Sequence, residues 1–360
     1  MNKKNISSIE LAALVNELQF LAQGKIDQIY HEERRELLLQ IHLPRQGKQL
    51  LRIIPGKFLN LTKNKSPFLR PSRLCMLLRK YLDHASIISI QQHEAERIAV
   101  LELEKEHNYF LIFELFSKGN IVLTDHNYKI IGVWQEQIWK DRAVKEKETY
   151  LFPKSINWKA ISEQELQKLL AKSDKKNIVT FLATELGVGG TYAEEICSRT
   201  HLDKTKAPAD LKSKEIQLIL KTLKDLMDVI KEPLGYIYEL DITALPLTNQ
   251  NPVRIAKTYN EALDTLNPFV TISPYEKKIK SLERTIADQE ETLQKHRENI
   301  ELNKKKGELV YEHYMKLQQL LEIVKELRKE KDWQEIEKEL KKEKKIKKVD
   351  LKEKKVVIEL

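Results

Sequence analysis

The stretch RPSRLCMLLRKYLDHASIISIQQHEAERIAVLELE, residues 70–104, decides the fold of this 360-residue chain. Apolar residues recur at helical spacing after its proline, which predicts a helix over Ser72–Leu82. Ile87–Ile90 and Arg97–Leu103 are rich in aliphatic residues and lie on either side of a polar turn, so they predict the two strands of a hairpin. A helix followed directly by antiparallel strands is typical of an α+β domain.

Strand patterns continue on both sides of this stretch, at short intervals and with polar turns between them. One helix precedes them. It opens at Ser7 with Glu10 three residues later, which is the spacing of a capping box. We therefore predict an α+β domain with a sandwich-like sheet that extends to about Pro153. The further predicted strands are Lys25–Tyr30, Glu36–Leu43, Gln49–Pro55, Lys57–Leu61, Tyr109–Leu115, Asn120–Thr124 and Lys129–Val133.

The pattern becomes mainly helical after Pro153 and changes again at Tyr275. Within the helical part, the segment Leu186–Ile196, LGVGGTYAEEI, places a tight glycine turn between two predicted helices. This arrangement resembles a helix-hairpin-helix motif. The predicted domains are residues 1–153 (α+β), 154–270 (helical), 274–340 (a long charged helix) and 341–360 (the start of a further domain).

From Tyr275 onward, apolar residues recur every three, four or seven positions between charged ones, which predicts the seam of a coiled coil. The pattern is interrupted at Asn303–Gly307 and then resumes. A seam of this length requires a partner helix, which we expect in a C-terminal part of the protein, in another chain or in a second copy. The alternative is a single exposed helix held by i,i+4 ion pairs. The seam residues are Ile279, Leu282, Ile286, Leu293 and Ile300, then Val310, Leu317, Leu321, Val324 and Leu327.

The composition is basic and rich in charge: charged residues make up 32% of the chain, and the net charge is +9. This balance is compatible with nucleic-acid binding, although Lys-rich solvated helices give the same sum. Cys75 and Cys197 are the two cysteines, and neither belongs to a CxxC pair, so we expect no metal and no cofactor. Because no signal peptide and no apolar run of about 18 residues is visible, we expect a cytoplasmic protein with no membrane partner.

Glu96 and Arg97, in the turn of the hairpin, are the first candidate binding residues. A guanidinium can clamp a phosphate or hydrogen-bond a base edge, and a neighbouring carboxylate can accept hydrogen bonds from a base. The alternative is an ordinary solvated ion pair. Glu10 is a further candidate if it lies near Glu96, and its alternative role is the capping box with Ser7.

Two further groups of residues could contact phosphate. The glycine turn offers backbone N–H groups at a helix N-terminus, which attracts anions, whereas close packing of the two helices would also explain the glycines. A basic face on the predicted outer side of the helix in the opening stretch could bind phosphate or could simply be solvated. The residues are Gly187, Gly189 and Gly190 in the turn, and Arg79 and Lys80 on the helix.

Catalytic motifs give no support for an enzyme. The sequence contains no GxGxxG after a strand, no Walker A motif, no HExxH and no GxSxG. The nine histidines are scattered, and no pattern places a pair of carboxylates around a pocket. We therefore expect a binding protein without a catalytic centre.

The opening stretch resembles the signature of the NFACT family of ribosome quality-control factors. That signature is roughly P-x-x-[FL]-C-x-L-L-R-K-x-L, followed by I-x-x-I-x-Q-x-x-x-D-R-[IV]. The resemblance extends over nearly all of the chain, and ELFSKGNIVLTD at residues 114–125 favours the archaeal-type branch. The matching residues in the signature are Pro71, Cys75, Leu77, Leu78, Arg79, Lys80, Leu82, Ile90, Gln92, Arg97 and Ile98, and further matches lie at residues 9–10, 17–18, 24–30, 150–153 and 307–311.

The resemblance implies an N-terminal domain related in fold to that of formamidopyrimidine-type DNA glycosylases, then a helix-hairpin-helix domain and a first coiled-coil arm. It implies a factor that binds tRNA and the rRNA and proteins of an obstructed large ribosomal subunit, and that supports template-free extension of the stalled chain. Glu10, Glu96 and Arg97 occupy the positions of the family's tRNA-contacting residues. The family typically has Asp at both acidic positions, so the glutamates either re-space that contact or weaken it.

The family pattern continues past the first arm into a middle domain, a returning coiled-coil arm and an RNA-binding C-terminal domain. We therefore expect this chain to be a truncated form or one half of a split protein, with the other half as a partner. A DNA glycosylase is a competing hypothesis, but Asn2 replaces its nucleophilic N-terminal proline, and two cysteines cannot form a four-Cys zinc finger. A surface adhesin would need an export signal, and none is visible.

Overall fold

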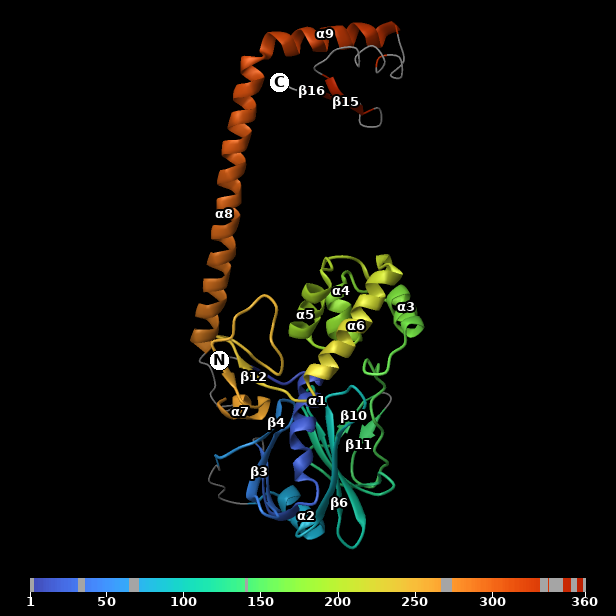
Figure 1. Ribbon diagram of the computed structural model, residues 1–360. Helices are drawn as coiled ribbons and strands as arrows, with labels where there is room; N and C mark the ends of the chain where they lie inside the picture. Colours follow the sequence, from blue (N-terminus) through green and yellow to red (C-terminus); the bar gives the residue numbers. More distant parts are fainter. Residues whose placement is uncertain are drawn as a thin grey trace. The chain divides into compact units, whose positions relative to one another are not determined.

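The computed structural model describes residues 3–31, 36–64, 71–139, 142–266, 274–330, 336, 346–350 and 355–358. The chain divides into two compact units, Met1–Pro268 and Phe269–Leu360 (Figure 1). The finer boundary near residue 153 remains a prediction. Among the described residues, no helix is both long enough and apolar enough to span a membrane.

The first unit is built on one antiparallel sheet of nine strands in the order β4-β3-β2-β1-β5-β6-β7-β8-β9. Neighbours in the sheet are consecutive in the chain except at the centre, where β1 pairs with β5 through Lys25 and Ser86. The prediction of an α+β domain with a large sheet is confirmed, and the narrow central junction lets the two halves of this one sheet lie around a helix. The strands are β1 Lys25–His31, β2 Leu37–Leu43, β3 Gly47–Ile54, β4 Phe58–Leu61, β5 Ser86–Gln92, β6 Ile98–Glu104, β7 Asn108–Glu114, β8 Asn120–Asp125 and β9 Ile130–Val133.

Helix α1, Ser8–Glu17, is the helix that lies between the two halves of the sheet (Figure 1). The predicted capping box is confirmed: the Ser7 hydroxyl accepts the Glu10 N–H at 3.2 Å, and Glu10 Oε2 accepts the Ser7 N–H at 2.8 Å. Every residue from Ser8 to Val15 is buried. The N-terminal helix is thus the centre of the core, and its first turn is held in one geometry.

Helix α2, Arg73–Leu82, begins after Ser72, whose hydroxyl accepts the Cys75 N–H at 3.0 Å. The predicted outward position of Arg79 is wrong, because its guanidinium donates twice to the Ile29 carbonyl of β1, at 3.0 and 2.7 Å. The cause lies in the sheet. Strand β1 pairs with β5 only at its first residue, so the Ile29 carbonyl has no hydrogen-bond partner in β5. A buried carbonyl needs a hydrogen-bond donor, and Arg79 supplies it.

A helical layer and a small sheet complete the first unit (Figure 1). The small sheet has the order β13-β12-β14, and β14, only three residues long, was not predicted. The remaining elements are a 3-10 turn η1 Leu18–Leu21, β10 Gln137–Ile138, β11 Ala143–Val144, α3 Glu163–Lys172, α4 Ile178–Thr180, a π-helical turn η2 Phe181–Glu185, α5 Gly190–Thr200, a 3-10 turn η3 Pro208–Asp210, α6 Ser213–Val229, β12 Gly235–Ile237, β13 Ile242–Thr243, β14 Arg254–Ala256 and α7 Tyr259–Asp264.

The second unit contains α8 Pro274–Glu312, α9 Tyr314–Glu330 and the hairpin strands β15 Ile346–Asp350 and β16 Lys355–Ile358. The apolar pattern is interrupted at Asn303–Gly307, but the helix is not: α8 continues through these residues and ends one residue before His313. A single glycine among lysines and glutamates costs about 1 kcal/mol of helix stability, which does not stop a long helix.

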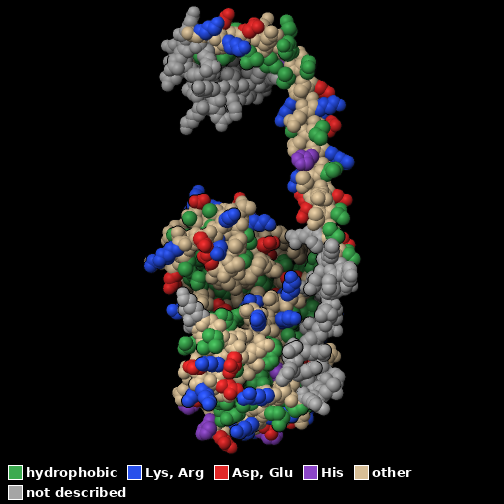
Figure 2. Space-filling model, turned by 180° about the vertical axis from the view of Figure 1, so that it is seen from behind, with side chains coloured by type: hydrophobic (Ala, Val, Ile, Leu, Met, Phe, Trp, Pro, Cys, Tyr) green, Lys and Arg blue, Asp and Glu red, His purple; other side chains and the backbone are tan. Residues whose placement is uncertain are grey.

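The apolar seam of α8 is exposed. Ile279, Leu282, Ile286, Leu293 and Ile300 are between 51% and 64% accessible. Figure 2 shows acidic and basic side chains together along this helix, with apolar side chains between them. An exposed apolar seam of this kind is the surface that a partner helix would cover.

Candidate functional site

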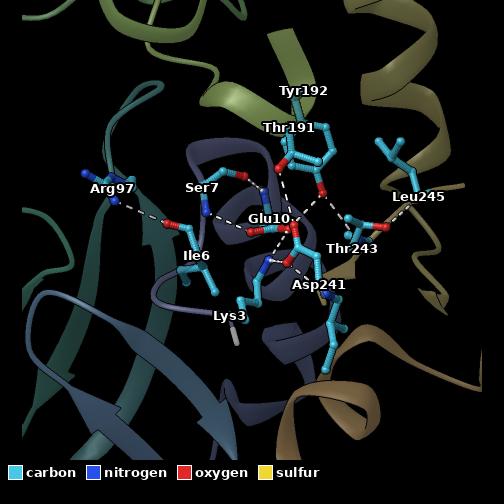
Figure 3. Close-up of polar contacts among 12 residues, drawn as sticks. Lys3, Ile6, Ser7, Glu10, Arg97, Thr191, Tyr192, Asp241, Thr243 and Leu245 are labelled. Carbon is cyan, nitrogen blue, oxygen red and sulfur yellow. Dashed lines mark hydrogen bonds and ion pairs between the residues drawn. The ribbon is translucent and has the colours of Figure 1, made fainter. Parts of the chain in front are cut away.

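A cleft of about 820 Å³ lies in the first unit, where three turns converge on the N-terminus of α1. It is formed by the N-terminal segment, the β5–β6 turn, the glycine turn before α5 and the loop at Asp241 (Figure 3). Six of the eight predicted site residues line this cleft, although they come from three distant parts of the sequence. They are Glu10, Glu96, Arg97, Gly187, Gly189 and Gly190.

Glu10 lies at the floor of the cleft and is 1% exposed. Besides its capping-box bond, its Oε1 accepts hydrogen bonds from Lys3 Nζ at 2.8 Å and from the Tyr192 hydroxyl at 3.0 Å. Burial alone would lower the pKa of Lys3, but the carboxylates of Glu10 and Asp241 outweigh it and raise that pKa. With its charge neutralised by Lys3, Glu10 acts as the support that joins α1 to α5 rather than as a free acceptor.

Arg97 is half-buried at the rim of the cleft. Its Nη1 donates to the Ile6 carbonyl at 3.4 Å, which engages one of the five N–H donors of a guanidinium. Burial lowers the pKa of Arg97, and the carboxylates of Glu96 and Glu10 oppose this shift, so the group stays charged. Within the described residues, Arg97 forms no ion pair with Glu96. Its remaining donors are therefore available to an anion in the cleft.

The Gln92 side chain fixes the turn that carries Glu96 through hydrogen bonds. The Gln92 side-chain amide donates to the carbonyls of Ser8 at 2.9 Å and of Glu96 at 2.7 Å, and its oxygen accepts from Lys159 Nζ at 2.6 Å. Burial lowers the pKa of Lys159 to about 8. These bonds tie the β5–β6 turn to the first turn of α1, so Arg97 projects from a supported backbone.

The glycine turn supplies the opposite wall. Gly187 and Gly189 have φ values of +81° and +89°, a region in which other residues are strained. The Ser8 hydroxyl donates to the Gly187 carbonyl at 2.9 Å, which joins this turn to α1. Helix α5 then begins at Gly190, and the first N–H groups of a helix have no acceptor within it. Those groups, with the positive end of the helix dipole, line the cleft.

Four residues whose polar contacts form the floor of the cleft were not predicted from the sequence. Lys3 bridges two carboxylates, because its Nζ also lies 2.8 Å from Asp241 Oδ1, and the Thr191 hydroxyl donates to Asp241 Oδ2 at 3.2 Å. Tyr192 is the fourth, with its hydroxyl on Glu10 (Figure 3). No local pattern marks these residues, since their contacts join positions about 50 to more than 200 residues apart.

Arg79 and Lys80 lie outside this cleft. The Arg79 guanidinium is used by the Ile29 carbonyl, and Lys80 Nζ lies 5.4 Å from the ring centroid of Tyr81. Neither residue lines the cleft that holds the other six candidates. Arg79 thus supports the sheet, and the structure does not bring the basic face of α2 to the candidate site.

Comparison with known proteins identifies the family of this chain. The model of the NFACT N-terminal and middle domains matches residues 7–359, and the chain belongs to this family. It is 31% identical over 362 residues to the archaeal Rqc2 homolog aRqcH of Methanocaldococcus jannaschii, covering 92% of this chain and 53% of that protein. It is 23% identical over 375 residues to the human ribosome quality control complex subunit NEMF, covering 92% of this chain and 35% of NEMF. The chain thus spans about half the length of the first relative and about a third of the second.

Two solved structures have a similar fold over about three quarters of this chain. The fibrinogen binding protein from Staphylococcus aureus aligns with a TM-score of 0.60 at 21% identity, over 74% of this chain and 99% of that one. The N-terminal part of the fibronectin/fibrinogen-binding protein from Streptococcus suis aligns with a TM-score of 0.58 at 21% identity, over 72% and 98%. These likenesses support a mixed fold of helices with a large antiparallel sheet. The relation to the glycosylase fold remains a prediction.

Proposed function

We propose that this chain is the tRNA-binding portion of a ribosome quality-control factor. In this proposal it acts in the cytoplasm on an obstructed large ribosomal subunit and supports template-free C-terminal tailing of the stalled chain. Family membership supports the role, because relatives that match most of this chain are named as ribosome quality control subunits or Rqc2 homologs. The tRNA, the rRNA and the proteins of the large subunit are the proposed partners.

The observation that carries the proposal is the position of Arg97 opposite the N-terminus of α5. A guanidinium with free donors and a helix N-terminus line one cleft, and both bind phosphate well. The cleft has ordered walls on three sides. This favours a ligand with a defined three-dimensional structure, such as the folded backbone of a tRNA. A base edge could reach Glu96, whose carboxylate can accept from an exocyclic amine.

Glu10 has a positioning role in this proposal. Its carboxylate holds Lys3, Ser7 and Tyr192, so it sets the distance between the Arg97 turn and the start of α5. The resemblance to the family implies Asp at this position. Glu10 is longer by one methylene, and this length lets a single side chain close the capping box and reach α5 as well.

The glycine turn serves as a helix-hairpin-helix motif in this proposal, and α8 serves as the first arm of a coiled coil. The exposed seam of α8 supports the second assignment, since 51% to 64% exposure of five apolar residues leaves a stripe for a partner helix. We propose that this partner is the returning arm, supplied by a C-terminal part of the same protein or by a separate chain.

We propose a binding role without catalysis, because the cleft offers anion-binding groups and a neutralised acid rather than a base paired with a nucleophile. Base excision by the purified chain, or trapping of a Schiff base on it, would instead support a DNA-repair enzyme. The two solved structures are those of fibrinogen-binding proteins, so a fibrinogen-binding adhesin is the alternative function. Saturable fibrinogen binding, together with the protein on the cell surface, would support that alternative.

The test is the affinity of the chain for tRNA, measured with Arg97→Ala beside the wild type. A charge-assisted hydrogen bond contributes about 1.5–3 kcal/mol, so we expect a loss of about 10- to 100-fold. Arg254→Ala is the matched control, because Arg254 is an exposed arginine of the same unit that does not line the cleft. Equal affinities for the two variants would reject the proposal.

A further inference from the structure

A second cleft, of about 500 Å³, adjoins the first. Lys4 and Asn5 line both clefts, so the two share a wall. The second cleft continues between the β3–β4 turn, which carries Lys57, and the β7–β8 turn, which carries Lys118, and it is also lined by Trp134. Three lysines and one aromatic ring from four separate segments thus meet beside the Arg97 cleft.

Backbone contacts hold these segments together. The Ile6 N–H donates to the Lys57 carbonyl at 3.0 Å, and the Gly56 N–H donates to the Glu114 carbonyl at 3.1 Å. The two turns touch so closely that a Cβ on Gly119 would lie 1.9 Å from the Gly56 nitrogen, and both glycines have φ values of +74°. The lysines therefore project from a frame whose spacing is set by the fold, not from independent loops.

The charges of this cleft have no counter-ion among the described residues. Lys4, Lys57 and Lys118 are exposed, and among the described residues none of their side chains forms an ion pair or a hydrogen bond. No Asp or Glu is among the described residues that line the cleft. Lys3, directly before Lys4, shows the contrast, because it pairs with two carboxylates. Lysine side chains that lie close together without a neighbouring carboxylate create a positive potential, and this potential attracts an anionic ligand.

Trp134 is half-buried and oriented by its surroundings. Its ring lies edge-to-face with the His31 ring at a centroid distance of 6.3 Å, and its backbone N–H donates to the Ile121 carbonyl at 2.9 Å. The next residue, Gln135, is clamped by the buried Asn120 side chain, which donates to its carbonyl at 2.8 Å and accepts its N–H at 3.2 Å. An indole ring held in this way at the wall of a cationic cleft is suited to stack on a base or a ribose.

We propose that this second cleft binds the sugar-phosphate backbone of the RNA strand that leaves the Arg97 cleft. Lys57 and Lys118, with Lys4 at the shared wall, contact successive phosphates, and Trp134 stacks on a base or ribose between them. This inference rests on the proposed function and extends it by a second contact region. An RNA strand uses both the lysines and the ring, whereas a lipid headgroup or an acidic peptide would use only the cations.

The test compares the salt dependence of tRNA affinity between two double variants of the 360-residue chain. Lys57→Gln/Lys118→Gln removes two lysines of the second cleft, and Lys105→Gln/Lys129→Gln is the control. The control removes two exposed lysines of the same sheet from turns at the other end of its strands. Each lost phosphate contact reduces the slope of log K against log[salt] by about 0.7 to 0.9. The loss of affinity between 50 and 200 mM salt should therefore be about 7- to 12-fold smaller for the first double variant and unchanged for the control.

Trp134→Leu provides an independent measurement. We expect it to lower the affinity by about fivefold or more without changing the slope, because stacking involves no counterion release. Unfolding curves of each variant must match the wild type for the comparison to count.

The outcomes separate the two proposals. If Arg97→Ala weakens binding while Lys57→Gln/Lys118→Gln behaves like its control, the second cleft does not bind RNA and the proposed function stands. If Arg97→Ala has no effect either, the proposed function fails and this inference fails with it. Loss of binding to anionic vesicles or to an acidic peptide, with tRNA binding unchanged, would assign the cleft to those ligands and overturn the inference.

Discussion

The Tyr192 hydroxyl donates to Glu10 Oε1 at 3.0 Å, and this bond joins the first turn of α1 to the first turn of α5 across 182 positions of sequence. Both residues are only 1% exposed. The same hydroxyl accepts the Ala244 N–H at 3.3 Å, so one group links three segments. The spacing of the cleft walls therefore depends on a bond in its floor.

Tyr192→Phe should destabilise the chain by about 1–3 kcal/mol, because it leaves a buried carboxylate and a buried N–H each short of a partner. The measurement is urea unfolding of the 360-residue chain. Tyr236→Phe is the control, since Tyr236 is half-buried and its hydroxyl forms no hydrogen bond with another described residue. Equal unfolding free energies for the two variants would show that the bond contributes nothing.

Glu10→Gln should cost more, about 3–5 kcal/mol, because it breaks a buried ion pair while keeping the shape of the side chain. The side chains of Lys3 and Glu10 are only 5% and 2% exposed, so Lys3 would keep its charge with Asp241 alone. Glu10→Asp retains the charge and should lose less. If Glu10→Gln were as stable as Glu10→Asp, the neutralising role of this residue would be refuted.

His31 makes stability depend on pH. Burial lowers its pKa to about 4 from 6.5, so the unfolded chain binds a proton that the folded chain does not. Its contribution is fully present above pH 6.5 and is lost as pH falls toward 4, by about 3 kcal/mol in total. The wild-type curve alone does not isolate this effect, because burial raises the pKa of Glu17 to about 7, which acts with the opposite sign.

The His31 effect is therefore measured as the difference in unfolding free energy between wild type and His31→Gln from pH 7 to pH 4. We expect this difference to shrink with falling pH. His84→Gln, at a histidine whose side chain is 76% exposed, is the control variant for loss of an imidazole at the surface. A His31→Gln difference that did not change with pH would contradict the assigned shift.

Gly189→Ala separates backbone strain from binding. At a φ of +89° the substitution is strained, and its Cβ would lie 3.3 Å from the Ser7 Cβ at the cleft. We expect a loss of about 1–3 kcal/mol in stability and weaker tRNA binding. Gly47→Ala is the control, because it has a φ of +74° with nothing nearby, away from the cleft. It should lose comparable stability and bind tRNA normally, and equal binding by both variants would exclude the glycine turn from the site.

Local patterns in the sequence predicted much of the fold. The helix and hairpin of residues 70–104 form where periodicity placed them, and the capping box of Ser7 and Glu10 is present. The inward position of Arg79 was missed because it depends on an unpaired carbonyl in β1, and pairing between strands is a tertiary property.

The candidate site was predictable only in part. Arg97 and the three glycines follow from a family signature and a turn motif, which are local. Lys3 and Asp241 could not be found, since their roles arise from contact between segments 238 positions apart. The same holds for the lysines of the second cleft, which no sequence pattern marks and which the fold brings together from two turns and the N-terminal segment.

The most direct test of the account is crosslinking to RNA in cells, comparing wild type, Arg97→Ala and Arg254→Ala. The account predicts crosslinks to tRNA and to large-subunit rRNA for the wild type, retained in Arg254→Ala and with the tRNA crosslinks strongly reduced in Arg97→Ala. Crosslinks mainly to DNA or mRNA, or tRNA crosslinks that are the same in all three proteins, would contradict it.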